Sequence, residues 1–396
     1  MATRKMLTGN YAAAYGAKLA RVEVFPAFPI TPQTPVMEKI VEFIENGELD
    51  AEFIPMESEH SVMAAAVAAE AMGARTFTAT SSQGLLYMHE NLFVASGIRL
   101  PVVMAIVNRV VGPPNTVLND LSDSLDQRDT SWIQIYVENA QEVLDMIPQA
   151  YRIGEDERVL LPVAICFEGI IISHYMEPVE ILDQDKVDHF LPPYRPKQVV
   201  LDPDRPMSLG QIVMDDTYIT EMKYQQQEAM DRSKAVIREV DEAFGDAFGR
   251  WYGGLFAAEW IDGAEVVLLT LGSLASTVRA VVKQLRDEAG LPIGFVKLRA
   301  FRPFPAQELR DCLSHVKAAV VLEKGVSIGA GGPVFLDLSH CLNRRDRMPL
   351  LIDYIVGLGG RDVTFEEVRN IALTVFEERH ADSITNPVRW HQVRGL

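Results

Sequence analysis

The heptapeptide Pro101-Val102-Val103-Met104-Ala105-Ile106-Val107 has no charged or hydrogen-bonding side chain. A short apolar run of this kind predicts a strand that is buried on both faces. Such strands belong to parallel sheets covered by helices, because parallel strands need a crossover connection that is usually helical. The fold around this strand is therefore expected to be α/β.

Strand-like and helix-like runs alternate on both sides of this stretch. We expect further strands at 22–25, 53–56, 76–79 and 159–167, and helices at 35–46, 61–71, 85–95 and 140–152. This alternation predicts a parallel sheet in a first domain, which we place at residues 1–175. Loops that follow the strands of such a sheet gather along one edge, where ligands bind.

A second α/β domain is predicted at residues 251–396. Its strands are expected at 266–269, 293–298, 318–322 and 350–356, with helices between them. The intervening residues 176–250 are assigned to an arm and a linker helix. Prolines crowd at 191–206 and predict either an extended arm over a neighbouring surface or a plain linker, and a charged helix is expected at 225–248.

The composition excludes several classes of protein. Hydrophobic residues make up 48% of the 396 residues, as in a packed globular protein. The formal net charge of −18 would repel the phosphates of nucleic acids. No apolar run reaches the ~18 residues of a membrane span, and residues 2–10 lack the apolar centre of a signal peptide. We therefore expect a cytoplasmic protein without nucleic-acid or membrane partners.

The cysteines argue against a metal site in this chain. Cys166, Cys312 and Cys341 are far apart in the sequence. Zinc and iron–sulfur sites usually take closely spaced thiolates, and the eight histidines show no such spacing either. Because Cys166 lies in an apolar run, we expect it to be a small core residue.

Glu59 is the first candidate for catalysis. It stands where a predicted strand meets an alanine-rich helix, and a partly buried carboxyl group can share a proton near neutral pH. The alternative is an ordinary acid at a helix N-terminus, which the helix dipole stabilises. Glu57 could take the role if the strand runs longer than expected.

Two further residues could bind a substrate. Arg109 follows the most hydrophobic strand and could grip a carboxylate through paired hydrogen bonds, or form an ion pair with Asp120 or Asp123. Thr31 lies in a proline-bracketed turn that would hold its hydroxyl rigidly, although most such threonines cap a helix.

Several loops between the predicted elements carry weaker signals. Thr80-Ser81-Ser82-Gln83-Gly84 offers hydroxyls, an amide and backbone donors ahead of a helix, suited either to a ligand or to helix capping. The acidic segment 119–129 fits no calcium or phosphate motif and is expected to be a solvated loop. The glycine runs at 329–332 and 357–360 are incomplete as dinucleotide motifs.

The motifs of this chain, in their order along the sequence, resemble those of the α subunit of the 2-oxoacid:ferredoxin oxidoreductases, the pyruvate:ferredoxin oxidoreductase family. The resemblance covers almost the whole chain and rests on Phe-Pro-Ile-Thr-Pro at 28–32, Glu-Ser-Glu at 57–59, Thr-Ser-Ser-Gln-Gly at 80–84, Asn-Arg at 108–109, Arg-Asp-Thr-Ser-Trp-Ile-Gln at 128–134, Leu-Pro-Pro-Tyr at 191–194, Leu-Arg-Ala-Phe-Arg-Pro-Phe-Pro at 298–305 and Gly-Leu-Gly-Gly-Arg-Asp-Val at 357–363.

The resemblance implies two parallel-sheet domains joined by an extended arm. The first would bind the aminopyrimidine of thiamine diphosphate, and the second would be a transketolase C-terminal-like domain. It further implies that Glu59 is the catalytic glutamate at the pyrimidine N1′ and that Thr31 and Arg109 bind the substrate. The loop residues Ser82, Gln83 and Gly84 would contact the cofactor.

The implied reaction is the oxidative decarboxylation of a 2-oxoacid with coenzyme A to acyl-CoA and CO2. Electrons would leave through [4Fe-4S] clusters to ferredoxin, or to another acceptor such as NAD. The chain lacks the Gly-Asp-Gly motif that holds magnesium and the diphosphate, and Gly245-Asp246 lies in an expected helix. A β subunit carrying the diphosphate and Mg2+ site is therefore expected, together with γ and ferredoxin-like δ subunits that carry the clusters.

The substrate stays open at this point. Leu121 and residues 110–114 depart from the commonest family pattern, so pyruvate competes with a branched-chain or aromatic 2-oxoacid such as phenylglyoxylate. Two other functions also fit part of the pattern. One is a thiamine-dependent carbon–carbon transferase of the transketolase type, and the other is a non-catalytic nucleotide-binding subunit of an electron-transfer protein.

Overall fold

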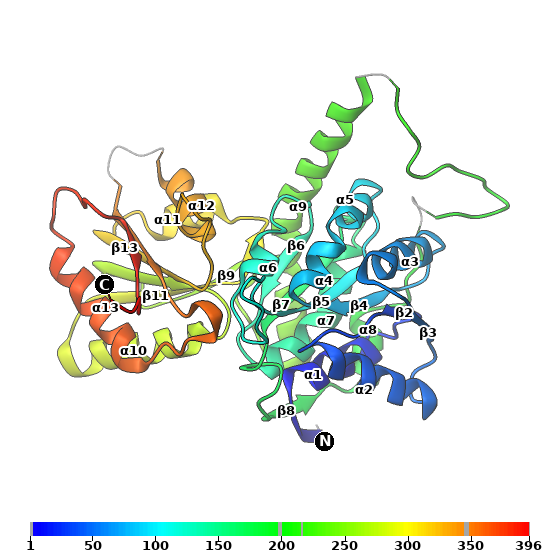
Figure 1. The fold of residues 1–396 in the computed structure, drawn as a ribbon, viewed down its shortest axis with the longest axis horizontal. Helices are drawn as coiled ribbons and strands as arrows, with labels where there is room; N and C mark the ends of the chain where they lie inside the picture. The colour runs from blue at the N-terminus through cyan, green and yellow to red at the C-terminus, as the bar shows by residue number, and fades with distance from the viewer. Residues whose placement is uncertain (1–2, 197–199, 215–216, 344–347, 396) are drawn as a thin grey trace.

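The computed structural model describes residues 3–196, 200–214, 217–343 and 348–395. Two α/β domains lie side by side, and the long helix α9 (Thr217–Phe248) runs along the N-terminal one (Figure 1). Within the described ranges, no helix is both long and apolar enough to cross a membrane.

The N-terminal domain is built on a largely parallel sheet, as predicted. A five-stranded sheet has the order β12-β6-β7-β5-β4, and only the β12–β6 pair is antiparallel. The parallel pair β2–β3 continues it beside β4 through a bridge between Val24 and Thr76. The strands are β2 (Val24–Ala27), β3 (Glu52–Pro55), β4 (Phe77–Thr80), β5 (Val103–Asn108), β6 (Ile133–Tyr136), β7 (Val163–Glu168) and β12 (Ala300–Arg302).

Helices cover both faces of this sheet, so β5 is buried throughout. Alternate side chains of β5 enter different cores: Val103 and Val107 pack in one, Met104 and Ile106 in the other. The first core includes α1 (Gly9–Leu19), α2 (Thr34–Glu45) and α7 (Ala140–Gly154), and the second includes α3 (Glu59–Ala71), α4 (Ser82–Tyr87) and α5 (His89–Gly97). This arrangement confirms the prediction made from the apolar heptapeptide.

Some elements differ from the prediction. The single helix expected at 85–95 is two helices that meet at Met88. Helix α1 was not predicted, because Gly9 and Gly16 make its sequence a poor helix former. A Cβ on Gly16 would lie 2.9 Å from Ile147, so glycine lets α1 approach α7 closely.

The region expected to be an arm contains more regular structure than its prolines suggested. Strand β8 (Glu177–Ile181) pairs with β1 (Thr3–Leu7), the helix α8 (Gln184–Phe190) follows, and α9 begins at Thr217 rather than at 225. The described residues between α8 and α9 form neither helix nor strand of a sheet, and they loop away from the domain near α3 before the chain enters α9 (Figure 1).

The C-terminal domain is a second, mainly parallel sheet with the order β15-β14-β13-β10-β11-β9, in which only β9 is antiparallel to its neighbour. Its elements are β9 (Phe256–Glu259), β10 (Val266–Thr270), α10 (Leu274–Ala289), β11 (Ile293–Leu298), α11 (Ala306–Cys312), β13 (Ala318–Glu323), α12 (Pro333–Leu342), β14 (Leu350–Ile355), the 3-10 turn η1 (Leu358–Gly360), α13 (Phe365–Glu378) and β15 (Val388–Trp390).

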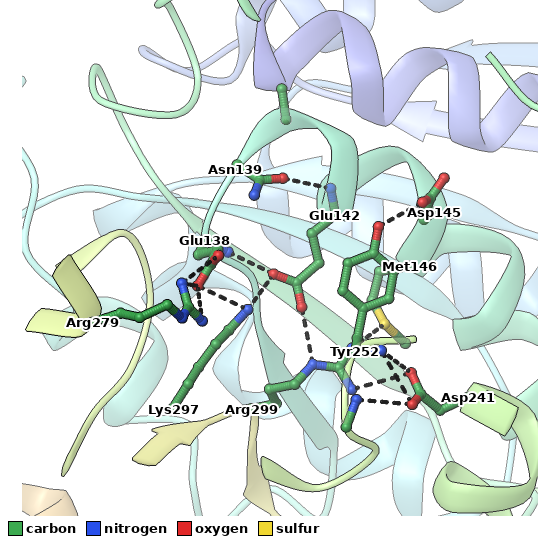
Figure 2. Close-up of polar contacts among 12 residues, drawn as sticks. Glu138, Asn139, Glu142, Asp145, Met146, Asp241, Tyr252, Arg279, Lys297 and Arg299 are labelled. Atoms are coloured by element: carbon green, nitrogen blue, oxygen red, sulfur yellow. Dashed lines mark hydrogen bonds and ion pairs between the residues drawn. The ribbon is translucent and has the colours of Figure 1, made fainter. Parts of the chain in front are cut away.

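The two domains are joined by a buried polar network around Glu142 of α7 (Figure 2). Lys297 and Arg299, which come from the C-terminal part of the chain, donate to its carboxylate at 2.6 and 2.9 Å. Burial alone would raise the pKa of Glu142, but these two cations hold the pKa below its usual range. Because β12 also adds to the N-terminal sheet, the domains share both hydrogen-bonded backbone and buried charge.

Candidate active site

The predicted site residues come together at one edge of the N-terminal sheet. Thr31 follows β2, Glu59 follows β3, the segment 82–84 follows β4 and Arg109 follows β5. These strands run parallel, so their carboxyl ends lie at the same edge. The tertiary structure thus gathers loops that are up to 78 residues apart in the sequence, as the contact between Arg109 and Thr31 shows.

Glu59 is the first residue of α3, and its side chain is buried. Among the described residues, its carboxylate has no hydrogen-bond or ion-pair partner. A Cβ built on Gly84 would lie 2.5 Å from its Oε1 atom, so the carboxylate rests directly against the backbone of α4. A buried charged group without a partner is costly, which favours a functional role over simple helix capping.

Glu57 lies outside this arrangement. Its side chain is exposed and accepts a hydrogen bond from the Ser61 hydroxyl, which lowers the pKa of Glu57. Ser58, between the two acids, caps α3 by accepting from the Ser61 N–H. Strand β3 ends at Pro55, so it is Glu59 that faces the sheet edge.

Arg109 spans the site between two other loops. Its Nη1 donates to the Thr31 carbonyl at 2.6 Å and its Nη2 to Gln83 Oε1 at 2.5 Å. Burial lowers the pKa of Arg109, and the negative charges of Asp123 and Glu59 oppose this shift. In the described part of the chain its guanidinium forms no ion pair, so of the two alternatives considered for Arg109 the ion pair with Asp120 or Asp123 is not formed.

The loop after β4 is held in a strained conformation. Ser82 has a φ of 47°, in the left-handed region, and its hydroxyl lies 2.6 Å from the Val110 carbonyl. Gln83 also contacts Asn115 at 3.3 Å, which ties this loop to the segment after β5. Among the described residues, several buried polar atoms at this edge have no hydrogen-bond partner, and Thr80 Oγ1 and Arg109 Nε are two of them.

Thr31 contributes its backbone to this cluster. Thr31 is exposed to solvent, and its backbone carbonyl accepts a hydrogen bond from Arg109. Helix α2 has Gln33 at its N-cap, so Thr31 does not cap that helix.

Sequence reasoning missed Asp123. The segment 119–129 was expected to be a solvated loop, but it contains the short helix α6 (Ser122–Leu125), and Asp123 is fully buried. Burial raises the pKa of Asp123 to about 7, although several hydrogen bonds to its carboxylate oppose the shift. Leu121 and Leu125, four residues apart, are the apolar pair that could have indicated a buried turn.

The cysteines take no part in this cluster. Cys166 is completely buried in the core, as predicted, and burial raises the pKa of its thiol. Across the described ranges, no group of three histidine, cysteine, aspartate or glutamate residues is arranged to hold a metal ion.

Comparison with known proteins identifies the family. Residues 15–242 match the family model described as pyruvate flavodoxin/ferredoxin oxidoreductase, thiamine diphosphate-binding. Residues 264–368 match the model for pyruvate:ferredoxin oxidoreductase core domain II. This chain belongs to the pyruvate:ferredoxin oxidoreductase family. The resemblance inferred from the motifs is confirmed, and so is the pairing of a thiamine diphosphate-binding domain with a second α/β domain.

Curated members of the family are similar over the whole chain. Pyruvate synthase subunit PorA of Pyrococcus furiosus is 47% identical over 395 residues, covering 100% of this chain and 99% of that protein. The PorA subunit of Methanocaldococcus jannaschii is 48% identical and covers 93% of each chain. Ketoisovalerate oxidoreductase subunit VorA of Pyrococcus horikoshii is 44% identical, covering 99% of this chain and 98% of that one.

Solved structures show the same fold at low sequence identity. The 2-oxoglutarate:ferredoxin oxidoreductase from Magnetococcus marinus matches with a TM-score of 0.71 and 19% identity, covering 94% of this chain and 65% of that one. A split-gene transketolase matches with a TM-score of 0.52 and 14% identity, covering 93% of this chain and 98% of that one. The second likeness agrees with the transketolase-like architecture expected for this family.

Proposed function

We propose that this chain is the α subunit of a heteromeric thiamine diphosphate-dependent enzyme that converts a 2-oxoacid and coenzyme A to acyl-CoA and CO2. The observation that carries the proposal is the buried Glu59 carboxylate, which lies beside Gly84 with no partner among the described residues and whose charge acts on Arg109. Subunits named for pyruvate synthase and ketoisovalerate oxidoreductase align with the whole chain, which supports the same reaction class here.

The residues at the sheet edge fit the aminopyrimidine of the coenzyme. A nitrogen heterocycle of this kind needs hydrogen-bonding partners in a largely apolar pocket. Within the described residues, neither the buried Glu59 carboxylate nor Thr80 Oγ1 has a hydrogen-bond partner, and the absence of a side chain on Gly84 lets both lie against the backbone of α4. In this proposal Glu59 binds the ring nitrogen N1′, and Ser82, Gln83 and Gly84 form the wall beside it.

When bound, thiamine diphosphate supplies a nucleophilic carbon and an electron sink for decarboxylation. Glu59 would hold or release a proton at the ring nitrogen, as a carboxyl group placed within hydrogen-bond reach of that nitrogen can do. Arg109 would bind the carboxylate of the 2-oxoacid, and Thr31 its oxo group. Arg109 is already oriented by Thr31 and Gln83, so little rotational freedom would be lost on substrate binding.

Other subunits would complete the site. This chain lacks a Gly-Asp-Gly motif, and Gly245-Asp246 lies within α9. We therefore assign the diphosphate and Mg2+ to a β subunit, and the [4Fe-4S] clusters and the transfer of electrons to ferredoxin to γ and δ subunits. The loop before α9 exposes Ile212 and Met214 by 86% and 92%, which suits a contact with such a partner. We also propose that the complex is located in the cytoplasm.

Pyruvate is the first substrate to test. Subunits named for pyruvate synthase align at up to 48% identity and those named for ketoisovalerate oxidoreductase at 44%, a difference too small to assign the substrate. Pocket volume decides between such substrates, and each methylene is worth only ~1–3 kcal/mol. The screen should therefore include 2-oxoisovalerate, 2-oxoglutarate and phenylglyoxylate.

The decisive experiment compares Glu59→Gln with Glu57→Gln in the purified complex. We expect Glu59→Gln to lower 2-oxoacid-dependent viologen reduction by at least ~100-fold, since general acid–base groups contribute about 10²–10⁴-fold. The exposed Glu57→Gln variant should behave as wild type, and both should assemble normally by size-exclusion chromatography. Full activity of Glu59→Gln would favour a non-catalytic electron-transfer subunit, and a wild-type complex without viologen reduction would favour a transketolase-type enzyme.

A further inference from the structure

Asp123 lies between the two loops that carry the candidate ligand-binding residues. Its Oδ2 accepts the backbone N–H of Ser82 at 2.8 Å and that of Arg109 at 3.0 Å. Its Oδ1 accepts the Asn108 side-chain amide at 2.7 Å and the Ser124 N–H at 2.8 Å. One buried carboxylate therefore connects the ends of β4 and β5 with α6.

This arrangement fills the bonding capacity of the carboxylate. A carboxylate has about four acceptor sites, and four N–H groups occupy them. In the described ranges no cation forms an ion pair with Asp123, so its carboxylate is held by these hydrogen bonds together with the more distant charge of Arg109. A buried carboxylate without an ion-pair partner is costly, and hydrophobic packing alone does not require one.

Both hydrogen bonds accepted by Asp123 Oδ2 help to fix the position of the Arg109 guanidinium. One fixes the Arg109 backbone directly. The other holds Ser82 in its left-handed conformation, and Ser82 directs the next residue, Gln83, whose Oε1 receives Arg109 Nη2. Asp123 thus sets both the origin of the arginine side chain and one of the groups that orient its end.

The C-terminal domain supports Asp123 from the other side. The Leu121 N–H donates to the Lys324 carbonyl at 2.8 Å. A Cβ on Gly325 would lie 2.3 Å from Leu125 Cδ1, so α6 is in close contact with the loop after β13. The position of α6, and with it Asp123, is therefore fixed by contacts between the two domains.

We propose that Asp123 is a positioning residue that holds Arg109 in place for the substrate carboxylate and couples this placement to the C-terminal domain. The proposal rests on the proposed role of Arg109 in substrate binding. In this role Asp123 affects the affinity for the 2-oxoacid in particular. A purely structural residue would not change that affinity while leaving the affinity for coenzyme A unchanged.

The test is a double-mutant cycle in the assembled complex, with pyruvate, or the best 2-oxoacid of the screen, as the varied substrate. Asp123→Ala should lower kcat/KM by about 10- to 100-fold, mainly through a higher KM for the 2-oxoacid, because a displacement of about 1 Å can cost 10²-fold. The KM for coenzyme A should not change. In an Arg109→Ala background, the same substitution should lower kcat/KM by less than about 2-fold, because residues that act through one another are not additive.

Two measurements keep the inference open to refutation. Asp126→Ala, at an exposed acid that caps the C-terminal end of the same helix, is the matched control and should retain wild-type kinetics. Hydrogen exchange should become faster at the Ser82 and Arg109 amides in Asp123→Asn, a variant of nearly unchanged volume that serves if Asp123→Ala does not fold. Equal losses of kcat/KM in both backgrounds, or unchanged exchange at both amides, would overturn the positioning role.

Failure of the underlying function would look different. If Arg109→Ala leaves kcat/KM for the 2-oxoacid unchanged, the role of Arg109 in substrate binding is refuted. The exchange rates then still decide whether Asp123 holds the two loops.

Discussion

Gly84 offers a direct test of the position of Glu59. Its φ lies outside the left-handed region, so the backbone of α4 does not need glycine, and alanine is the better helix former by about 0.5–1 kcal/mol. A Cβ there would lie 2.5 Å from Glu59 Oε1 and 2.7 Å from Thr80 Oγ1. Because Oε1 is the end of a flexible side chain, Gly84→Ala should fold normally while pushing the carboxylate away.

The size of the effect follows from this distance. Ordinary van der Waals contact begins at 3.4 Å, so the carboxylate oxygen has to retreat by about 1 Å, and a misplacement of that size costs about 100-fold in rate. We therefore expect Gly84→Ala to lower kcat for 2-oxoacid-dependent viologen reduction by about 100-fold, with an unchanged unfolding temperature of the isolated chain.

Gly97→Ala is the matched control for this prediction. Gly97 is also helical, and a Cβ there would meet its nearest neighbour, Gln226 Nε2, at an ordinary 3.8 Å. This variant should keep wild-type activity. A wild-type kcat in Gly84→Ala would refute the reasoning, because catalysis would then not depend on the present position of the Glu59 carboxylate.

Three further predictions concern stability of the isolated chain. Glu142→Gln should lower the free energy of unfolding by about 3 kcal/mol near pH 7, because Lys297 and Arg299 lose a buried partner. The folded-state pKa of Glu142 is lowered, so this loss should shrink as the pH falls below about 4, where urea titrations can follow it. Thr364→Ala removes a capping box at α13 and should cost about 1 kcal/mol in the same assay. Burial raises the pKa of Asp353, which interacts with the buried Glu323, so its ionisation destabilises the fold as the pH rises above about 4. Asp353→Asn should therefore raise the melting temperature at about pH 8 and have little effect near pH 4, and equal effects at both values would contradict this account.

The sequence alone predicted the architecture, because the pattern of apolar residues follows the local geometry of strands and helices. The run at 101–107 predicted the central buried strand, and the alternation around it predicted the parallel sheet. Where tertiary contacts override local preference, prediction failed. The glycine-containing helix α1 exists because it packs closely on α7, and α8 forms in a region whose prolines suggested an irregular arm.

The sequence also indicated which residues could carry the chemistry, since Thr31, Glu59 and Arg109 each follow a predicted strand and parallel strands end at one edge. Only the tertiary structure decided how they are held. In the folded chain Glu57 is exposed to solvent, and the Arg109 guanidinium donates to Thr31 and Gln83. Asp123 is buried and accepts a hydrogen bond from the Ser82 backbone. The physical reason is that the hydrophobic periodicity of a strand or helix depends on residues close together in the sequence. The hydrogen-bond partners in the site are tens of residues apart and come together only when the chain folds.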